Sequence, residues 1–495
     1  MYLIGYDIGS SSVKASMVDA ESGQCLASAF YPKKEMEIKA VKPGWAEQHP
    51  DLWWDNLKAA TADILSESHI NPSGVKGIGI SYQMHGLVAI NRNRQALRPS
   101  IIWCDSRAVS YGEKAFTDIG GDQCLSHLLN SPGNFTASKL KWVKEKEPDI
   151  YRQIYKIMLP GDYIAMRLTG NICTTATGLS EGIMWDFKND AVASFLLDYY
   201  GFDKELIPDL LPTFSNQGEV TAEAADELRL AKGIPVTYRA GDQPNNAFSL
   251  NVLNPGEIAA TAGTSGVVYG VSSDITYDPQ SRVNTFAHIN HTKADARLGV
   301  LLCINGTGIL NSWARNNAGF TDSSYEAMNA AASDIAPGSD GLTVLPFGNG
   351  SERMLNNKNI GCSMHNINFN VHSNKHILRA SQEGIAFAFR YGMDIMKDIG
   401  ISPAVIRAGK ANMFLSPIFR DTLSTITDTT IELYNTDGSQ GAARGAGVGA
   451  GIYKTFNEAF SGLKKLETVH PKKEMTIPCM EAYERWKKAL IIAIS

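Results

Sequence analysis

Two short segments combine a glycine, hydroxyl side chains and a preceding apolar run, and one lies in each half of the sequence. The first is Gly9-Ser10-Ser11-Ser12 and the second is Gly263-Thr264-Ser265. Each pattern predicts a strand and a hairpin turn whose N–H groups and hydroxyls can donate hydrogen bonds to phosphate. The first copy adds Asp7 for a metal ion and Lys14 for phosphate, which suits a metal-bound polyphosphate. An ordinary hairpin with solvated hydroxyls is the alternative for either copy alone, but the pair indicates two domains that hold one nucleotide.

A second candidate for chemistry is Asp242, which follows the apolar run 234–238 and a glycine. An acid at the end of a strand can accept the proton of a substrate hydroxyl as its oxygen attacks phosphorus. The competing interpretation is a helix N-cap, because Pro244 suits a first helical turn.

A polar cluster follows the predicted strand 75–81. Amide, imidazole and carboxylate groups there could hydrogen-bond the hydroxyls of a polyol, and an indole could pack on its carbon face. A structural histidine is the alternative for His85. The candidate residues are Gln83, Met84, His85, Trp103 and Asp105.

Two glycine-containing segments lie late in the chain. Gly409-Lys410-Ala411-Asn412 follows a predicted strand, and residues 438–447 open a helix rich in Gly and Ala. Small side chains allow a planar group such as adenine to lie against the backbone. Close helix packing is the alternative for residues 438–447.

Composition narrows the class of protein. The chain has 495 residues, of which 44% are hydrophobic, and a formal net charge of −5. This length suits two large domains, and the turn-rich connector 251–256 predicts domains at 1–250 and 251–495. The charge disfavours nucleic acid or an anionic membrane as the main partner and favours a small-molecule substrate.

Cysteine usage and the chain start predict a cytoplasmic location. The seven cysteines are scattered and never form a C-x-x-C pair, so we expect reduced thiols and no structural zinc. Residues 1–7 lack a basic n-region, and no apolar run approaches the roughly 20 residues of a membrane span.

Hydrophobic periodicity predicts alternating strands and helices, which indicates an α/β protein. The first half begins with an antiparallel meander and continues with helices, of which the one at 150–168 is interrupted at Pro160. The expected strands are 2–8, 13–18, 24–31, 75–81, 257–272, 300–305 and 404–408, and the expected helices are 50–68, 137–147, 150–168, one from 308, 376–397, 438–453 and 480–494.

Read in order, these segments resemble the FGGY family of carbohydrate kinases, in the superfamily of actin-like ATPases, Hsp70-like proteins and sugar kinases. Residues 43–48 (Pro-Gly-Trp-Ala-Glu-Gln), 83–86 and 159–163 (Leu-Pro-Gly-Asp-Tyr) also match, and they are closest to family members that act on D-xylulose. The resemblance covers nearly the whole chain. It implies an α/β fold of two ribonuclease-H-like domains with an interdomain cleft, which close on ATP and a ketose.

The resemblance also implies roles for individual residues. Asp242 would be the catalytic base and would lie with Asp7 near Mg²⁺, partly through water. The sugar would contact Gln83, Met84, His85, Trp103, Asp105 and Asp242, while the nucleotide and its phosphates would contact Gly9, Ser10, Ser11, Ser12, Lys14, Gly263, Thr264, Gly306, Gly409, Lys410 and Asn412.

Three alternatives remain open at this point. A kinase of this family could act on ribulose, fuculose or glycerol, because a few pocket groups set specificity. The same fold could serve an actin-like or Hsp70-like ATPase, against which Asp242 and the polar cluster argue. Lys410 makes the expected adenine-side wall bulkier than in many relatives, so nucleotide preference is open. Oligomeric state is also open, and the sequence is compatible with a homodimer.

Overall fold

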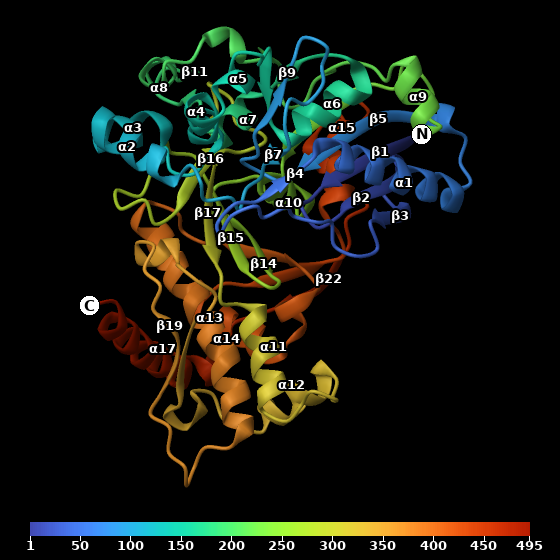
Figure 1. Cartoon of the computed structure of the whole chain (residues 1–495). Coiled ribbons are helices and arrows are strands. Elements are labelled where there is room, and N and C mark those ends of the chain that lie inside the picture. The colour runs from blue at the N-terminus through green and yellow to red at the C-terminus, as the bar shows by residue number, and fades with distance from the viewer. The chain divides into compact units, whose positions relative to one another are not determined.

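The computed structural model describes residues 1–495 and divides into two compact units. Unit 1 comprises residues 1–251, 286–298 and 436–463, and unit 2 comprises 252–285, 299–435 and 464–495. Two segments that the sequence-based division assigns to 251–495 therefore pack with unit 1. Each unit is built around its own sheet (Figure 1).

Unit 1 is centred on a five-stranded sheet with the order β13-β5-β1-β2-β3. The first three strands form the antiparallel meander predicted from the sequence, whereas β5 and β13 run parallel to β1. The bounds are β1 Tyr2–Ile8, β2 Val13–Asp19, β3 Cys25–Tyr31, β5 Val75–Tyr82 and β13 Val236–Gly241.

Two helices cover opposite faces of this sheet. Helix α1 (Pro50–Ser68), predicted correctly, lies on the face of Tyr6, whose hydroxyl is 2.8 Å from Thr61 Oγ1. Helix α15 (Gly438–Gly449) lies on the other face, because successive strand residues point to opposite sides, and it contacts β1 and β5 although it is distant in sequence (Figure 1).

The approach of α15 requires glycine in the sheet. A Cβ on Gly5 would lie 1.8 Å from the carbonyl oxygen of Ser439, and one on Gly79 would lie 1.9 Å from that of Ala442. Residues 438–449 therefore serve close helix packing, which was one of the two interpretations of this segment.

The other elements of unit 1 are short, and one prediction among them was wrong. The segment 150–168 is not one interrupted helix, because Pro160 begins a helix at its first position, where its missing N–H is not needed. These elements are β4 Glu47–Gln48, β6 Val88–Ile90, β7 Ser100–Ile101, α2 Val109–Ile119, α3 Gly121–Leu128, α4 Thr136–Lys146, α5 Pro148–Tyr151, β8 Lys156–Met158, α6 Pro160–Thr169, β9 Cys173–Thr174, α7 Ala176–Glu181, β10 Trp185–Asp186, β11 Ala191–Val192, α8 Ser194–Tyr200, β12 Asp209–Leu210, α9 Ala222–Leu228, α10 Asp242–Ser249 and α16 Phe456–Ala459.

The sheet of unit 2 repeats the connectivity of the first. Its order is β16-β17-β15-β14-β20-β21-β22, with β14 and β15 forming an antiparallel hairpin and β20 and β21 running parallel to β14. The bounds are β14 Glu257–Ala262, β15 Gly266–Ser272, β16 Asn284–Ala287, β17 Leu298–Ile304, β20 Val405–Gly409, β21 Ile431–Tyr434 and β22 Lys465–Val469.

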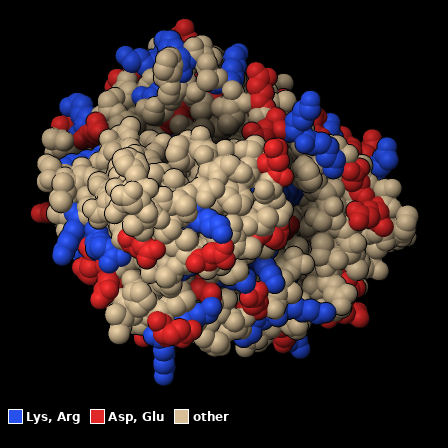
Figure 2. Space-filling model, turned by 90° about the horizontal axis from the view of Figure 1, so that it is seen from below, with Lys and Arg blue, Asp and Glu red and all other residues tan.

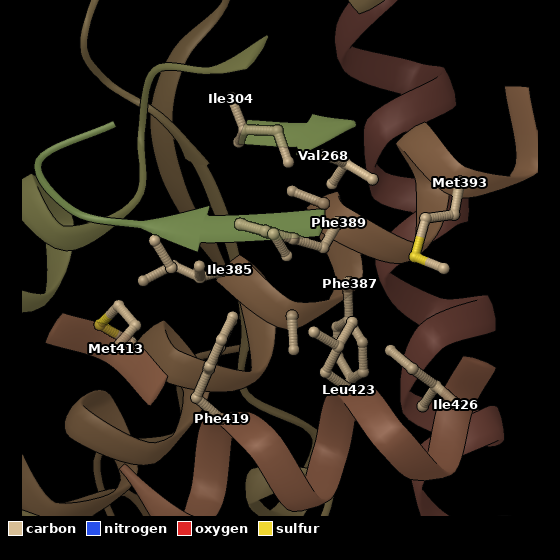
Figure 3. Packing of buried hydrophobic residues seen from close by; sticks show 14 of the residues in the cluster. Val268, Ile304, Ile385, Phe387, Phe389, Met393, Met413, Phe419, Leu423 and Ile426 are labelled. Carbon is tan, nitrogen blue, oxygen red and sulfur yellow. The ribbon is translucent and has the colours of Figure 1, made fainter. Parts of the chain in front are cut away.

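The helices of unit 2 enclose a continuous apolar core. Ile385, Phe387 and Phe389 of α13 pack with Phe419 and Leu423 of α14 (Figure 3). The last helix begins at residue 473 rather than 480 and contains Pro478, and its buried residues start at Cys479. The remaining elements are α11 Gly308–Asn317, α12 Tyr325–Ser333, β18 Thr343–Phe347, β19 Gly361–His365, α13 Asn374–Asp398, α14 Pro417–Thr427 and α17 Lys473–Ile494.

The surface carries both signs of charge. Figure 2 shows Lys and Arg interspersed with Asp and Glu over the face seen from below. Each of the helices falls short of the length or the apolarity that crossing a membrane requires.

Candidate active site

The carboxyl ends of three parallel strands bring the candidate catalytic residues of unit 1 to one edge of the sheet. Asp7 of β1 pairs in register with Ser81 of β5, which pairs with Ala240 of β13. Asp242 follows directly after β13, and His85 follows β5 by three residues. This edge is where open α/β sheets bind ligands.

Asp242 is half-buried at the first position of α10. Gly241 occupies the N-cap, so the alternative that Asp242 is an ordinary N-cap is wrong. Burial, and to a smaller extent the nearby charge of Asp7, raise the pKa of the Asp242 carboxyl to about 7, although hydrogen bonds from Gln243 lower it. A carboxyl with a pKa near neutrality suits a general base.

Asp7 lies between the first hairpin and the start of α15. Its Oδ1 accepts a hydrogen bond from Ser81 Oγ at 2.8 Å, and a Cβ on Gly438 would lie 2.4 Å from its Oδ2. Burial raises the pKa of Asp7, although Lys14, opposite it on β2, lowers it. The helix N-terminus beside Asp7 favours the ionised carboxylate.

The first hairpin turn is held by its neighbours. The N–H of Gly9 donates to the carbonyl of Ser12 at 3.0 Å, and the carbonyl of Ser10 accepts from Gln48 Nε2 at 2.7 Å. Ser11 and Lys14 are exposed, whereas Ser10 and Ser12 are partly buried. The N–H of Gly9 is therefore used within the turn, whereas the exposed hydroxyl of Ser11 and the exposed ammonium of Lys14 can reach a phosphate.

Met84 and His85 lie close to Asp242. A Cβ on Gly241 would come within 2.7 Å of Met84 Cγ, so the thioether side chain lies against the residue that precedes Asp242. His85 has a left-handed backbone conformation with φ 63°, its Nδ1 is 2.8 Å from the carbonyl of Glu181, and its ring contacts Phe135. Left-handed backbone at a non-glycine residue, here next to Met84 and in contact with Glu181, is a feature that functional sites often contain.

Sequence reasoning missed Glu181, a buried acid at the end of α7. A Cβ on Gly241 would lie 2.4 Å from its Oε2, so its carboxyl lies beside the same backbone as Met84. Burial raises the pKa of Glu181 well above its usual range, and Asp242 and Asp162 raise it further. Burial therefore favours the protonated form of Glu181, and a single Glu at a helix end carries no sequence signal for such a position.

Gln83, Trp103 and Asp105 lie in different environments. Gln83 is buried and its Nε2 donates to Gln48 Oε1 at 3.4 Å. Trp103 is 53% exposed, and its Nε1 donates to Ser10 Oγ at 3.3 Å, which places the indole beside the first hairpin.

Asp105 is fully buried, and its carboxylate is engaged by Arg107 at 2.7 Å and by the N–H of Ala46 at 2.6 Å. These partners occupy both oxygens. The sugar contact expected of Asp105 stays a prediction, and the bonds to Arg107 and Ala46 hold its carboxylate within its loop.

A buried lysine joins the two polar segments. Lys139 of α4 is completely buried, and its ammonium donates to the carbonyl of His85 at 2.8 Å and to that of Ile102 at 3.0 Å. Burial lowers the pKa of Lys139 to about 7, although Asp105 raises it. One cation therefore holds the loop of Met84 and His85 against the loop that begins at Trp103.

We expect Lys139→Met to raise the KM for the sugar by about 10- to 100-fold, the range for the loss of a charged hydrogen-bond donor, because the bonds to the carbonyls of His85 and Ile102 are lost. The KM for the nucleotide should change little, because the contacts of Lys139 lie in unit 1. Steady-state kinetics with each substrate varied measure this split. Lys141→Met, on the same helix and paired only with Glu145, is the control, and an unchanged sugar KM in folded Lys139→Met would contradict the positioning role.

The second hairpin lines a cavity of about 720 Å³ in unit 2. Gly263, Thr264 and Asn412, all expected at the nucleotide, belong to its wall. The carbonyls of Gly263 and Thr264 accept from the N–H groups of Gly308 and Ile309 at the start of α11. The turn is therefore fixed to a helix that also lines the cavity.

Three other residues expected at the nucleotide do not line this cavity. A Cβ on Gly306 would lie 1.6 Å from the carbonyl oxygen of Pro346, so that glycine serves a close backbone contact. Lys410 pairs with Glu467 at 3.0 Å, and Gly409 ends β20. Any contact of Gly306, Gly409 or Lys410 with a nucleotide stays a prediction.

Comparison with known proteins identifies similar chains over nearly the whole length. The N-terminal domain of the FGGY family of carbohydrate kinases matches residues 2–249, and its C-terminal domain matches residues 258–451. A xylulose kinase from Klebsiella pneumoniae is 28% identical over 90% of this chain and 88% of its own.

Solved structures share the fold. A xylulose kinase from Rhodospirillum rubrum covers 99% of both chains with a TM-score of 0.89 at 24% identity. A gluconate kinase from Lactobacillus acidophilus also has a TM-score of 0.89, at 22% identity, covering 100% of this chain and 98% of its own. These likenesses confirm the fold class, and the equal scores leave the sugar undecided.

Proposed function

The chain belongs to the FGGY family of carbohydrate kinases, and from that premise we propose that it transfers the γ-phosphate of ATP to D-xylulose, forming D-xylulose 5-phosphate. The family makes it a phosphotransferase with an alcohol group as acceptor. Its similarity to xylulose kinases supports the ketose. The observation that carries the proposal is Asp242, with a pKa near 7, beside Met84 and His85.

We assign the sugar to unit 1 and the nucleotide to unit 2. Met84, His85 and Gln83 would contact the ketose, with Trp103 at the rim. In unit 2, the cavity lined by Gly263, Thr264 and Asn412 would hold ATP. The hydroxyls of Ser10, Ser11 and Ser12, together with Lys14, would contact phosphate from unit 1.

The residues fit a magnesium ion bound mainly through phosphates. Mg²⁺ commonly takes one or two protein carboxylates and completes its shell with water and phosphate oxygens. Asp7 and Asp242 of unit 1 supply two carboxylates, and they are close enough for the charge of Asp7 to raise the pKa of Asp242. Bound there, the ion would neutralise charge on the transferring phosphoryl group.

Asp242 would accept the proton of the terminal sugar hydroxyl while that oxygen attacks the γ-phosphorus in line. Met84 and His85 would orient the sugar so that the hydroxyl lies within about 3.5 Å of the phosphorus. Asp7, fixed by Ser81 and α15, would hold its charge in place and keep the pKa of Asp242 raised. Positioning and charge stabilisation would supply most of the rate.

A substrate panel tests the proposal. ADP release is measured with ATP and Mg²⁺ across pentuloses, hexuloses and polyols, and without any sugar. We expect the highest kcat/KM with D-xylulose and little ADP release in its absence. A clear preference for ribulose, fuculose, gluconate or glycerol would reject D-xylulose but keep the reaction, and sugar-independent hydrolysis would favour an actin-like or Hsp70-like ATPase.

A further inference from the structure

A completely buried amide lies behind the cavity of unit 2. Gln382 of α13 is 0% exposed. Its Nε2 donates to Asn329 Oδ1 at 2.8 Å and to Asn311 Oδ1 at 3.2 Å. Its Oε1 accepts from Ser416 Oγ at 2.6 Å. A buried polar side chain among apolar neighbours is costly unless every group is paired, and Gln382 is fully paired.

The polarity of this network is set by a helix N-terminus. Ser416 is the N-cap of α14, and its hydroxyl accepts from the N–H of Phe419. A backbone N–H can only donate, so the hydroxyl proton is left for Gln382 Oε1. The amide of Gln382 must then direct its N–H groups toward Asn311 and Asn329. Both asparagines consequently turn their carbonyl oxygens toward Gln382 and their amide nitrogens away from it.

The two asparagines line the same cavity as the second hairpin. Asn311 projects from α11 and Asn329 from α12, and both form the cavity wall with Gly263 and Thr264. Neither Nδ2 atom has a hydrogen-bond partner in the protein. The cavity therefore contains two oriented donors, held by one buried side chain, which can donate to acceptors on a bound molecule.

The supporting helices resist reorientation of the network. Ile385 and Phe389 follow Gln382 on α13 and pack into the core with Phe419 of α14 (Figure 3). The rings of Phe389 and Phe419 meet edge to face at 5.5 Å. Because both ends of the network belong to packed helices, its hydrogen bonds are preorganised before a ligand arrives.

We propose that Asn311 and Asn329 bind ring nitrogens of the adenine of ATP through their amide N–H groups, and that Gln382 is the positioning residue that sets this polarity. The inference rests on the proposed nucleotide role of the cavity. The ligand class that fits is a purine nucleotide recognised by acceptor atoms of its base. The exocyclic amino group of adenine, a donor, would not be read by these residues.

The experiment combines two changes. Protein variants alter the hydrogen-bond network of Gln382, and deaza analogues of ATP each lack one acceptor nitrogen of the adenine ring. Gln382→Leu removes the network, whereas the carboxylate of Gln382→Glu accepts from both asparagines and turns their carbonyl oxygens into the cavity. Calorimetry measures the Kd of ATP and of 1-, 3- and 7-deaza-ATP. Thermal melting and the sugar KM show whether a variant has lost its overall fold. Gln217→Leu, which removes a buried amide from unit 1, is the control variant.

We expect the Kd of ATP to rise about tenfold in Gln382→Leu and about 100-fold in Gln382→Glu, with the sugar KM within about twofold. At least one deaza analogue should bind the unmodified protein about tenfold more weakly than ATP, and Gln382→Leu should lose that discrimination. If the Gln382 variants do not fold, the same binding measurements are made with Asn329→Ala, at the partly exposed end of the network.

The outcomes separate the inference from the proposed function. If the unmodified protein binds no nucleotide, the proposed function fails and the inference falls with it. If it binds ATP but folded variants bind equally well, or Gln382→Leu keeps full discrimination against the deaza analogues, only the inference is overturned.

Discussion

Asp242→Asn is expected to lower kcat by about 10²- to 10⁴-fold, the usual contribution of a general base. Asparagine keeps the shape of the side chain but cannot accept the hydroxyl proton. The sugar KM should change little, because Met84 and His85 remain in place. Steady-state kinetics at saturating ATP and Mg²⁺ measure the effect, and calorimetry with the sugar shows whether binding survives.

The pH profile is the control for this interpretation. Only the ionised Asp242 carboxylate can take the proton, so kcat/KM of the unmodified enzyme should rise as pH increases through about 7 and level off above it. Asp242→Asn should lack this limb. Near-normal kcat in Asp242→Asn, together with loss of activity in Asp7→Asn, would show that the base is another group.

Gly79→Ala is expected to destabilise unit 1 by about 3 kcal/mol or more, at the upper end of the range for overpacking. The new Cβ would lie 1.9 Å from the carbonyl oxygen of Ala442 and 2.7 Å from its carbonyl carbon. The clash is with the backbone of α15, which, unlike a side chain, cannot move by changing rotamer, so the whole helix must shift. That shift would also move Gly438 away from Asp7. Urea unfolding measures the stability and kcat the local effect.

Gly77→Ala is the matched control. It lies two residues earlier on the same face of β5, where a Cβ would meet its nearest neighbours, Leu3, Ala446 and Thr237, at 3.3 to 3.4 Å. We expect a much smaller loss of stability there. Equal unfolding midpoints for the two variants would contradict the close approach of α15.

Local pattern explains why much of the fold was predictable. Apolar runs predicted β1, β2 and β5, and amphipathic spacing predicted the helix α1; the structure has all four at nearly the same bounds. The same pattern placed Asp7 and Asp242 at strand ends. Parallel strands then bring such ends together without further information.

Burial and long-range partners explain what was not predictable. The sequence did not predict that Asp105 is buried or that its carboxylate pairs with Arg107 and the N–H of Ala46. Lys139 and Gln382 show no pattern along the chain, because their hydrogen-bond partners come from other elements. The N-cap interpretation of Asp242 failed by one position, since Gly241 occupies the cap.

The sequence by itself determined the repeated strand–turn units, the acids at their ends and the family of carbohydrate kinases, because these depend on residue types at short spacing. Only the tertiary structure decided that residues 436–463 pack with unit 1, that Glu181 lies beside Asp242, and that Gln382 orients two amides toward the cavity of unit 2. These features depend on which distant side chains share a buried volume. An unpaired polar group in a buried volume is costly, so buried polar side chains pair with whichever groups the fold places next to them. Local sequence pattern cannot predict those pairs, because the partners are distant in the sequence.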